Sequence, residues 1–115
     1  MKFVALIALV AALAVASVAS AATPTLVGTV GPGFTITLTK GGKKVSKLTA
    51  GTYVFKISDK SSIHNFTLNG PGISNKTITG TSFVGSKTVT LTVKKGSYRF
   101  YCTVHPTITG TFKVT

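Results

Sequence analysis

Acidic residues are almost absent from this sequence of 115 residues, which contains one aspartate, Asp59, and no glutamate. Glycoside hydrolysis needs a pair of carboxyl groups and calcium binding needs a cage of oxygen ligands, so both functions are excluded. Lysine and arginine together number 13, but only Lys43-Lys44 and Lys94-Lys95 are adjacent. Nucleic-acid readers cluster their basic residues, so we expect no nucleic acid partner and instead a general attraction to anionic surfaces or acidic proteins.

Sulfur-containing residues are equally scarce, since Cys102 is the only cysteine and Met1 the only methionine. Residues 3–16 form an unbroken apolar run behind Lys2, and Ala19-Ser20-Ala21 provides a cleavage-type site. The run is shorter than the ~20 residues that cross a bilayer, so we expect no stable membrane insertion. The sequence predicts a signal peptide at residues 1–21, a secreted or periplasmic protein, and a single domain at residues 22–115.

The remaining sequence has the period-two pattern of β-strands, rich in threonine, valine and isoleucine and interrupted by glycine. It contains no helix signal, which indicates an all-β domain. Residues 69–82 are predicted as one long irregular connection across the outside of the sheets. Eight strands are predicted, at residues 25–30, 34–39, 44–49, 52–58, 64–68, 87–93, 97–102 and 111–115.

The lone cysteine needs a role, because an unpaired cysteine in an oxidising compartment is an intermolecular bridge, a reactive thiol, a metal ligand or a buried inert group. Alternation places Cys102 on the same inward face as Phe100, and His64 on the same inward face as Phe66. His105 follows in the loop after Cys102. If these strand ends lie at the same end of the domain, one thiolate and two imidazoles meet. That set suits copper, whereas structural zinc needs a fourth donor that the chain barely offers.

The C-terminal stretch GSYRFYCTVHPTITGTFKV, residues 96–114, together with the pair His64-Asn65 at the start of a strand, resembles the cupredoxins, or blue copper proteins. The small plastocyanin and amicyanin type is the most similar. The resemblance covers the whole domain after the predicted signal peptide. It implies a Greek-key β-sandwich or barrel of about eight strands that binds one copper ion through His64, Cys102 and His105.

The resemblance also implies roles for the neighbours of these ligands. Asn65 would tie the two ligand loops together, and its backbone would help to hydrogen-bond the thiolate. Tyr101, which faces away from the ligands, and the exposed edge of His105 would be two exits for electrons toward partner proteins.

One position departs from the cupredoxin pattern. The short-loop type places a weak axial methionine three residues after the second histidine, where this sequence has Ile108. An aliphatic side chain cannot coordinate, so the resemblance implies three strong ligands and at most a distant carbonyl such as that of Ile63. Either the site works without an axial ligand, which raises its potential, or the site has decayed.

The sequence thus predicts a monomeric blue copper (type 1) protein, not an enzyme, that carries single electrons between protein partners in the cell envelope. The partners would be redox proteins that carry acidic residues. The alternative is a cupredoxin-fold domain without redox copper that binds cell-wall or other anionic surfaces, or that handles copper. A cysteine hydrolase would pair Cys102 with His105, but it lacks an orienting acid and leaves His64 without a role.

Overall fold

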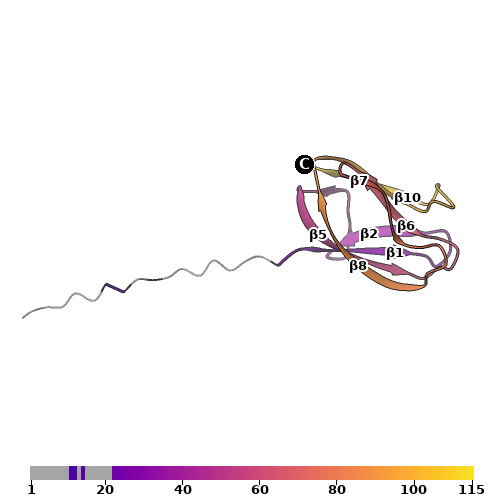
Figure 1. Ribbon diagram of the computed structural model, residues 1–115, viewed down its shortest axis with the longest axis horizontal. Helices are drawn as coiled ribbons and strands as arrows, with labels where there is room; N and C mark the ends of the chain where they lie inside the picture. Colours follow the sequence, from indigo (N-terminus) through magenta and orange to yellow (C-terminus); the bar gives the residue numbers. More distant parts are fainter. Residues whose placement is uncertain (1–10, 13, 15–21) are drawn as a thin grey trace, which may run out of the picture.

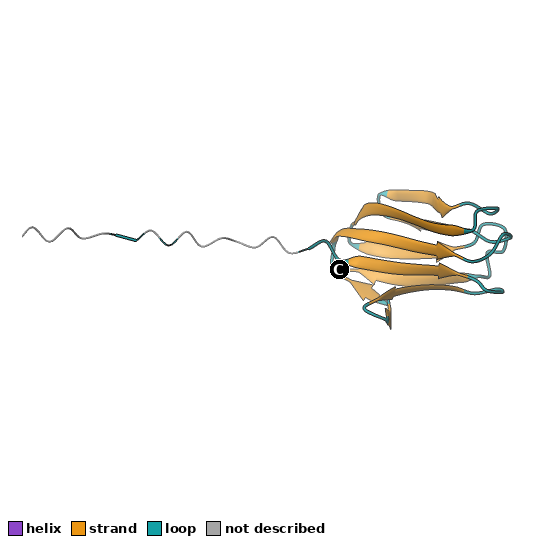
Figure 2. Cartoon of the chain, turned by 90° about the horizontal axis from the view of Figure 1, so that it is seen from below, coloured by secondary structure: helices purple, strands orange, loops and turns teal. Residues whose placement is uncertain are grey.

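Two five-stranded β-sheets pack face to face in the part of the chain that the structure describes (Figure 1, Figure 2). The structure, a computed structural model, describes residues 11, 12, 14 and 22–115. It confirms the predicted all-β class. The predicted signal peptide, residues 1–21, lies outside the described residues except for three alanines, and it stays a prediction. Nowhere in the described residues is there a helix of the length and hydropathy that crossing a bilayer requires.

The two sheets draw their strands from both halves of the chain. The first sheet has the order β3-β2-β1-β5-β8, and the second has the order β4-β10-β9-β6-β7. Neighbouring strands are antiparallel except for β1 with β5 and β4 with β10, which are parallel. The strands are β1 (Thr25–Val30), β2 (Ile36–Lys40), β3 (Lys43–Lys44), β4 (Lys47–Leu48), β5 (Gly51–Asp59), β6 (Phe66–Gly70), β7 (Ile73–Thr79), β8 (Gly85–Val93), β9 (Gly96–Tyr101) and β10 (Thr109–Val114).

The hydrophobic core lies between the sheets, because alternate residues of the strands point inward. In the second sheet the aromatic rings of Phe66 and Phe100 stack with centroids 5.7 Å apart. Gly110 of β10 is required beside them, since a Cβ there would overlap the ring of Phe100. In the described part of the chain, every core residue lies between Leu26 and Val114.

Two of the strand predictions are wrong, and the sandwich has ten strands rather than about eight. Residues 73–79, predicted as irregular, form β7 on the edge of the second sheet. The register between β7 and β6 is irregular, and Asn75 has a positive φ. Both interrupt the alternation of side chains along β7, so the period-two pattern that would predict a strand there is weak. The predicted strand 44–49 is divided into β3 and β4, which belong to different sheets. The chain crosses between the sheets there, because Val45 bonds back to β2 while Ser46 bonds to β10.

Four loops meet at one end of the sandwich, which we call the loop end (Figure 2). They are residues 31–35, 60–65, 80–84 and 102–108. Strand pairing brings them together, because β1, β5, β7 and β9 end there and β2, β6, β8 and β10 begin there. We call the opposite part of the sandwich, with both ends of the described domain and the remaining turns, the far half.

Candidate metal centre

His64, Cys102 and His105 meet at the loop end of the sandwich. His64 precedes β6 and Cys102 follows β9, and these strands are antiparallel neighbours with Thr67 opposite Tyr101. The pairing therefore sets His64 beside Cys102, and the loop after β9 returns His105 to the same point. The His64 Nδ1 atom lies 3.0 Å from His105 Nδ1 and 3.8 Å from Cys102 Sγ. All three donor atoms lie within 4.8 Å of one another, so the structure brings together the three residues that the sequence singled out.

The separations between these donor atoms fit a shared metal ion. Metal–nitrogen bonds of about 2.0–2.1 Å and a metal–sulfur bond of about 2.3 Å, arranged trigonally, separate nitrogen from sulfur by about 3.8 Å and the two nitrogens by about 3.5 Å. The distance from His64 Nδ1 to Cys102 Sγ matches the first value, and the distance between the histidine nitrogens is about 0.5 Å shorter than the second. The largest separation in the cluster, up to 4.8 Å, is about 1 Å longer than the first value, so binding an ion would draw His105 and Cys102 closer together. Two imidazoles and one thiolate form the donor set that suits copper.

The cluster is closed on its inner side and open on its outer side. His64 and Cys102 are both fully buried, whereas His105 is half-buried. The Nε2 atom of His64 is buried without a hydrogen-bond partner in the structure. The alternation that placed His64 and Cys102 on inward faces is therefore confirmed, and His105 is the residue that connects the cluster to the surface.

Asn65 ties the two ligand loops together, as the resemblance implied. Its backbone N–H donates to Cys102 Sγ at 3.4 Å. Its side-chain Oδ1 accepts from the backbone N–H of Thr103 at 3.0 Å, and its Nδ2 donates to the Thr103 hydroxyl at 2.6 Å. The same amide also reaches the hydroxyls of Thr67 and Thr81, so one buried side chain joins three segments of the chain.

Asp59, the only acidic residue of the sequence, shapes the loop that carries His64. It is buried at the end of β5, and its Oδ1 accepts from the backbone N–H of Ser61 at 3.0 Å. The Ser61 hydroxyl in turn accepts from the backbone N–H of Ile63 at 3.3 Å. These hydrogen bonds close the local turns that aspartate and serine side chains favour. Sequence reasoning missed this role, although the spacing of Asp59 and Ser61 is a signal for such a turn.

Arg99 holds the second ligand loop from the outside. Its guanidinium donates to the carbonyl oxygen of Pro106 at 2.8 Å and to the hydroxyl of Thr109 at 2.9 Å. It also stacks 4.2 Å from the centre of the Tyr101 ring. Tyr101 faces outward as expected, and its hydroxyl donates to Oδ1 of Asn75 at 2.7 Å. The loop that carries His105 is therefore fixed by β9 as well as by Asn65.

Phe34 covers both histidines, a contact that the sequence did not predict. Its ring meets the rings of His64 and His105 edge to face, with centroid distances of 4.8 Å and 5.2 Å. Phe34 is nevertheless 66% exposed. Three other exposed apolar residues occupy the remaining loops of this end, namely Ile63, Val84 and Val104. We call these four residues the apolar rim of the loop end, and the half-buried His105 lies in a loop of the same end.

Ile108, which the resemblance sets at the position of the axial methionine, is buried, and its backbone forms hydrogen bonds with both ends of the second ligand loop. Its backbone N–H donates to the carbonyl oxygen of His105 at 2.9 Å, and its carbonyl oxygen accepts from the backbone N–H of Cys102 at 3.1 Å. The two bonds close the loop from residue 102 to residue 108 into a compact turn. No thioether is available to the cluster, because Met1 is the only methionine in the sequence.

Comparison with known proteins gives matches at the level of structure. No protein-family model and no curated protein sequence matches the chain. A structure of the copper protein rusticyanin matches with 20% identity and a TM-score of 0.61, covering 84% of this chain and 80% of that chain. Reduced rusticyanin matches with 22% identity and a TM-score of 0.58, covering 84% and 82%. Rusticyanin from Thiobacillus ferrooxidans matches with 23% identity and a TM-score of 0.51, covering 84% and 79%.

At 20–23% sequence identity, the similarity to these structures establishes the fold. The match spans the described sandwich, and the His64, Cys102 and His105 cluster occupies the loop end of that sandwich. The predicted cupredoxin-like architecture is therefore confirmed, and this chain has the cupredoxin fold.

Proposed function

We propose that this protein is a mononuclear blue copper protein that carries single electrons between protein partners in the cell envelope. The observation that carries the proposal is the convergence of His64, Cys102 and His105 within 4.8 Å at the loop end of a cupredoxin fold. When bound, one copper ion supplies a one-electron couple between Cu(II) and Cu(I), which a thiolate and two imidazoles suit. The chain itself holds the ligands, limits solvent access and offers an exit for the electron.

Rigid support of the ligands favours this role. Asn65 joins both ligand loops, Asp59 and Ser61 shape the loop of His64, and Arg99 holds the loop of His105. Ligands whose positions are fixed by surrounding hydrogen bonds keep their geometry when the charge at the site changes. A site that keeps its geometry loses little energy in rearrangement during electron transfer.

The apolar rim of the loop end supports a transient partner. Phe34, Ile63, Val84 and Val104 are each more than half exposed and leave the ring edge of His105 near the surface. Small contacts of this kind are typical of brief redox encounters. We propose redox proteins with acidic surfaces as the partners, because long-range attraction to the basic domain would speed their encounter.

Catalysis at the thiol forms no part of this proposal. Cys102 is fully buried, so a substrate carbonyl cannot approach its sulfur, whereas a cysteine nucleophile must be accessible. We propose a monomer that is secreted or periplasmic, on the basis of the signal peptide predicted at residues 1–21.

Titration of the copper-free protein with Cu(II) tests the proposed function. We expect one ion per chain, an intense visible charge-transfer band, and bleaching by ascorbate that reverses on reoxidation without loss of copper. A protein that binds copper but stays colourless would contradict the electron-carrier role. Release of copper to a chelator at every reduction would also contradict it and would favour copper handling.

Replacing Ile108 with methionine should lower the reduction potential. A thioether in the axial position stabilises Cu(II) more than Cu(I), and a difference of about 2 kcal/mol corresponds to roughly 85 mV, given ~59 mV per tenfold for one electron. Voltammetry of the variant measures the shift. Ile108→Leu is the matched control, because leucine has a similar volume and cannot coordinate, so its potential should stay near that of the wild type. An unchanged or raised potential in Ile108→Met would show that residue 108 does not occupy the axial position.

A further inference from the structure

Positive charge covers the surface of the domain without any acidic side chain to balance it. The 13 lysine and arginine residues include Lys2 and Arg99, and the other eleven are lysines between residues 22 and 115 that are all exposed. The only acidic side chain, that of Asp59, is 1% exposed. The exposed lysines therefore have no exposed acidic side chain with which to pair.

These lysines are scattered in the sequence but unevenly placed in the fold. Only Lys60 lies in the four loops of the loop end, and Lys56, Lys76 and Lys87 lie along strands. The other seven belong to the turns and strand ends of the far half. We call them the far-half lysines: Lys40, Lys43, Lys44, Lys47, Lys94, Lys95 and Lys113.

Several far-half lysines are direct neighbours of one another. Lys40 pairs with Lys43 across β2 and β3, and Lys47 pairs with Lys113 across β4 and β10. Like charges placed opposite each other on neighbouring strands are destabilising. An anionic partner on this surface would relieve that repulsion, since the only acidic side chain of the sequence, that of Asp59, is buried at the other end of the domain.

The far half lacks the apolar residues that anchor a protein partner. Five large apolar side chains are exposed in the described part of the chain, and none lies in the turns of the far half. Four of them form the rim of the loop end, and the fifth, Val27, lies within β1. Protein interfaces bury an apolar centre, so the far half fits a broad anionic surface better than a folded partner.

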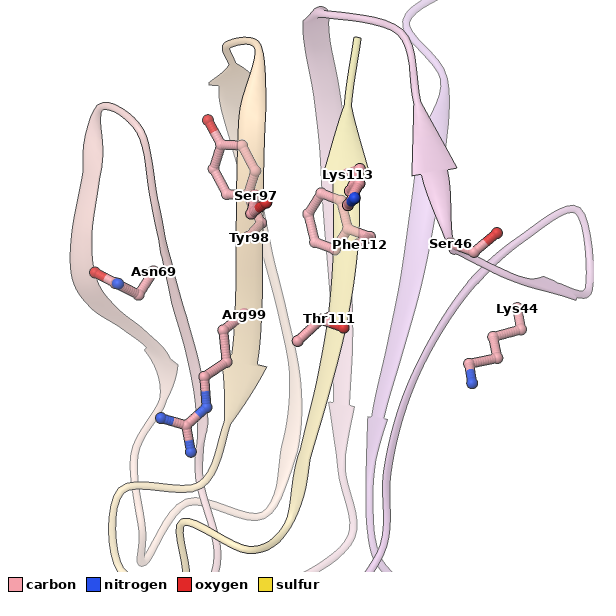
Figure 3. A pocket seen from close by; sticks show the side chains of 9 residues that line it. All are labelled: Lys44, Ser46, Asn69, Ser97, Tyr98, Arg99, Thr111, Phe112 and Lys113. Carbon is pink, nitrogen blue, oxygen red and sulfur yellow. The ribbon is translucent and has the colours of Figure 1, made fainter.

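A groove on the outer face of the second sheet includes two of the far-half lysines (Figure 3). It measures about 600 Å³, and Lys44 and Lys113 line it together with the hydroxyls of Ser46, Ser97 and Thr111. Ammonium and hydroxyl groups are hydrogen-bond donors, and the oxygens of a phosphate group accept hydrogen bonds from both. The groove can therefore receive a phosphate group at the edge of the far half.

The start of the domain lies on the same side as these lysines. Residues 22–24 precede β1 and join the domain in the far half, where the C-terminus also lies (Figure 1, Figure 2). In the sequence, the apolar run at residues 3–16 comes shortly before this point. As long as the predicted signal peptide, residues 1–21, is attached, it joins the domain on the side of the far half.

We propose that the far-half lysines dock the domain on the surface of a bilayer that contains anionic phospholipids, with the loop end and its metal centre directed away from the lipid. The binding is peripheral and electrostatic, since no apolar side chain of this surface is available to insert. It requires neither copper nor the proposed electron transfer, so it is measured on the copper-free protein.

The test uses residues 22–115, the domain that remains after the predicted cleavage and that contains all ten strands of the described sandwich, and vesicles of phosphatidylcholine with about one third phosphatidylglycerol. Sedimentation with these vesicles should bind the protein at low salt, and pure phosphatidylcholine vesicles should not. Binding should be lost at about 0.5 M salt, where the screening length falls to about 4 Å. Each lysine near an anionic bilayer contributes roughly fivefold to partitioning.

Two variants, each with four lysines replaced, distinguish the effect of where the positive charge lies from the effect of how much charge there is. In the first, Lys43, Lys44, Lys94 and Lys95 become glutamine, and we expect binding to fall by at least about tenfold. The control changes Lys56, Lys60, Lys76 and Lys87 to glutamine, which removes the same charge from other exposed positions, and its binding should fall by less than about threefold. Circular dichroism checks that both variants fold.

Three results would overturn the proposal. Equal losses in the two variants would mean that net charge alone attracts the protein to lipid. Failure of the wild type to bind anionic vesicles at low salt would remove the docking surface. Tight binding to soluble polyglutamate combined with no binding to vesicles would assign the lysines to an acidic protein instead.

Discussion

Replacing Cys102 with serine is expected to abolish the intense visible band of the copper-loaded protein and to weaken Cu(II) binding by more than about 100-fold. The band requires charge transfer from a thiolate sulfur, and a serine oxygen is a harder and poorer donor for copper. Loss of a partner that only supports a ligand already costs 10–100-fold in metal affinity, so loss of the ligand itself should cost more. Absorption spectroscopy and competition with a chelator measure the two effects.

The matched control for this experiment is Tyr101→Phe. Tyr101 is the neighbour of Cys102 but faces the opposite side of the sheet, where its hydroxyl bonds to Asn75. This variant should keep the band and the affinity of the wild type. A band that survives in Cys102→Ser would show that the sulfur is not a copper ligand and would end the blue copper assignment.

Replacing Asn65 with alanine is expected to lower the free energy of unfolding of the copper-free protein by about 2–3 kcal/mol. Its side chain makes four hydrogen bonds, among them the bonds to the backbone and hydroxyl of Thr103, and it is 3% exposed. Each bond contributes about 0.5–1.5 kcal/mol, and the buried groups left without partners add to the cost. Urea denaturation measures the change.

Asn69→Ala is the control for the loss of an amide side chain, because Asn69 lies on β6, which Asn65 directly precedes. Asn69 is exposed and accepts one bond, from the backbone N–H of Asn75, so its removal should cost less than about 1 kcal/mol. Equal losses in the two variants would show that Asn65 is not a special link between the ligand loops. In the copper-loaded protein, Asn65→Ala should also broaden or shift the visible band, since the thiolate loses its ordered surroundings.

The ligand cluster could be predicted from the sequence because its signals are local. Period-two alternation gives the inward faces of His64 and Cys102, and the spacing from Cys102 to His105 fits one short loop. The link through Asn65 followed from resemblance, and its hydrogen bonds confirm it. Cys102 directly follows β9, which is the central strand of its sheet and alternates between buried and more exposed residues, so its face is the easiest to recognise.

Other features depend on which segments meet in space, which local patterns do not contain. In the sequence, Phe34 is an aromatic residue in a loop rich in glycine and proline, with nothing that relates it to the histidines. The pairing of β1 with β5 in the structure brings that loop beside them. The uneven placement of the lysines likewise follows from strand order, since Lys47 and Lys113 are 66 positions apart in the sequence yet paired in the second sheet. The edge strand β7 was missed because Asn75 and its irregular register break the alternation.

The pairing of β6 with β9 also fixes when the ligand cluster can form during folding. These strands are neighbours in the sheet, but β7 and β8 lie between them in the sequence, so their association must close a long stretch of chain. Until they associate, His64 and Cys102 are separate and the thiol is unprotected. Metal loading must therefore follow tertiary assembly rather than guide it, and the burial of Cys102 becomes the safeguard of the newly folded protein against oxidation.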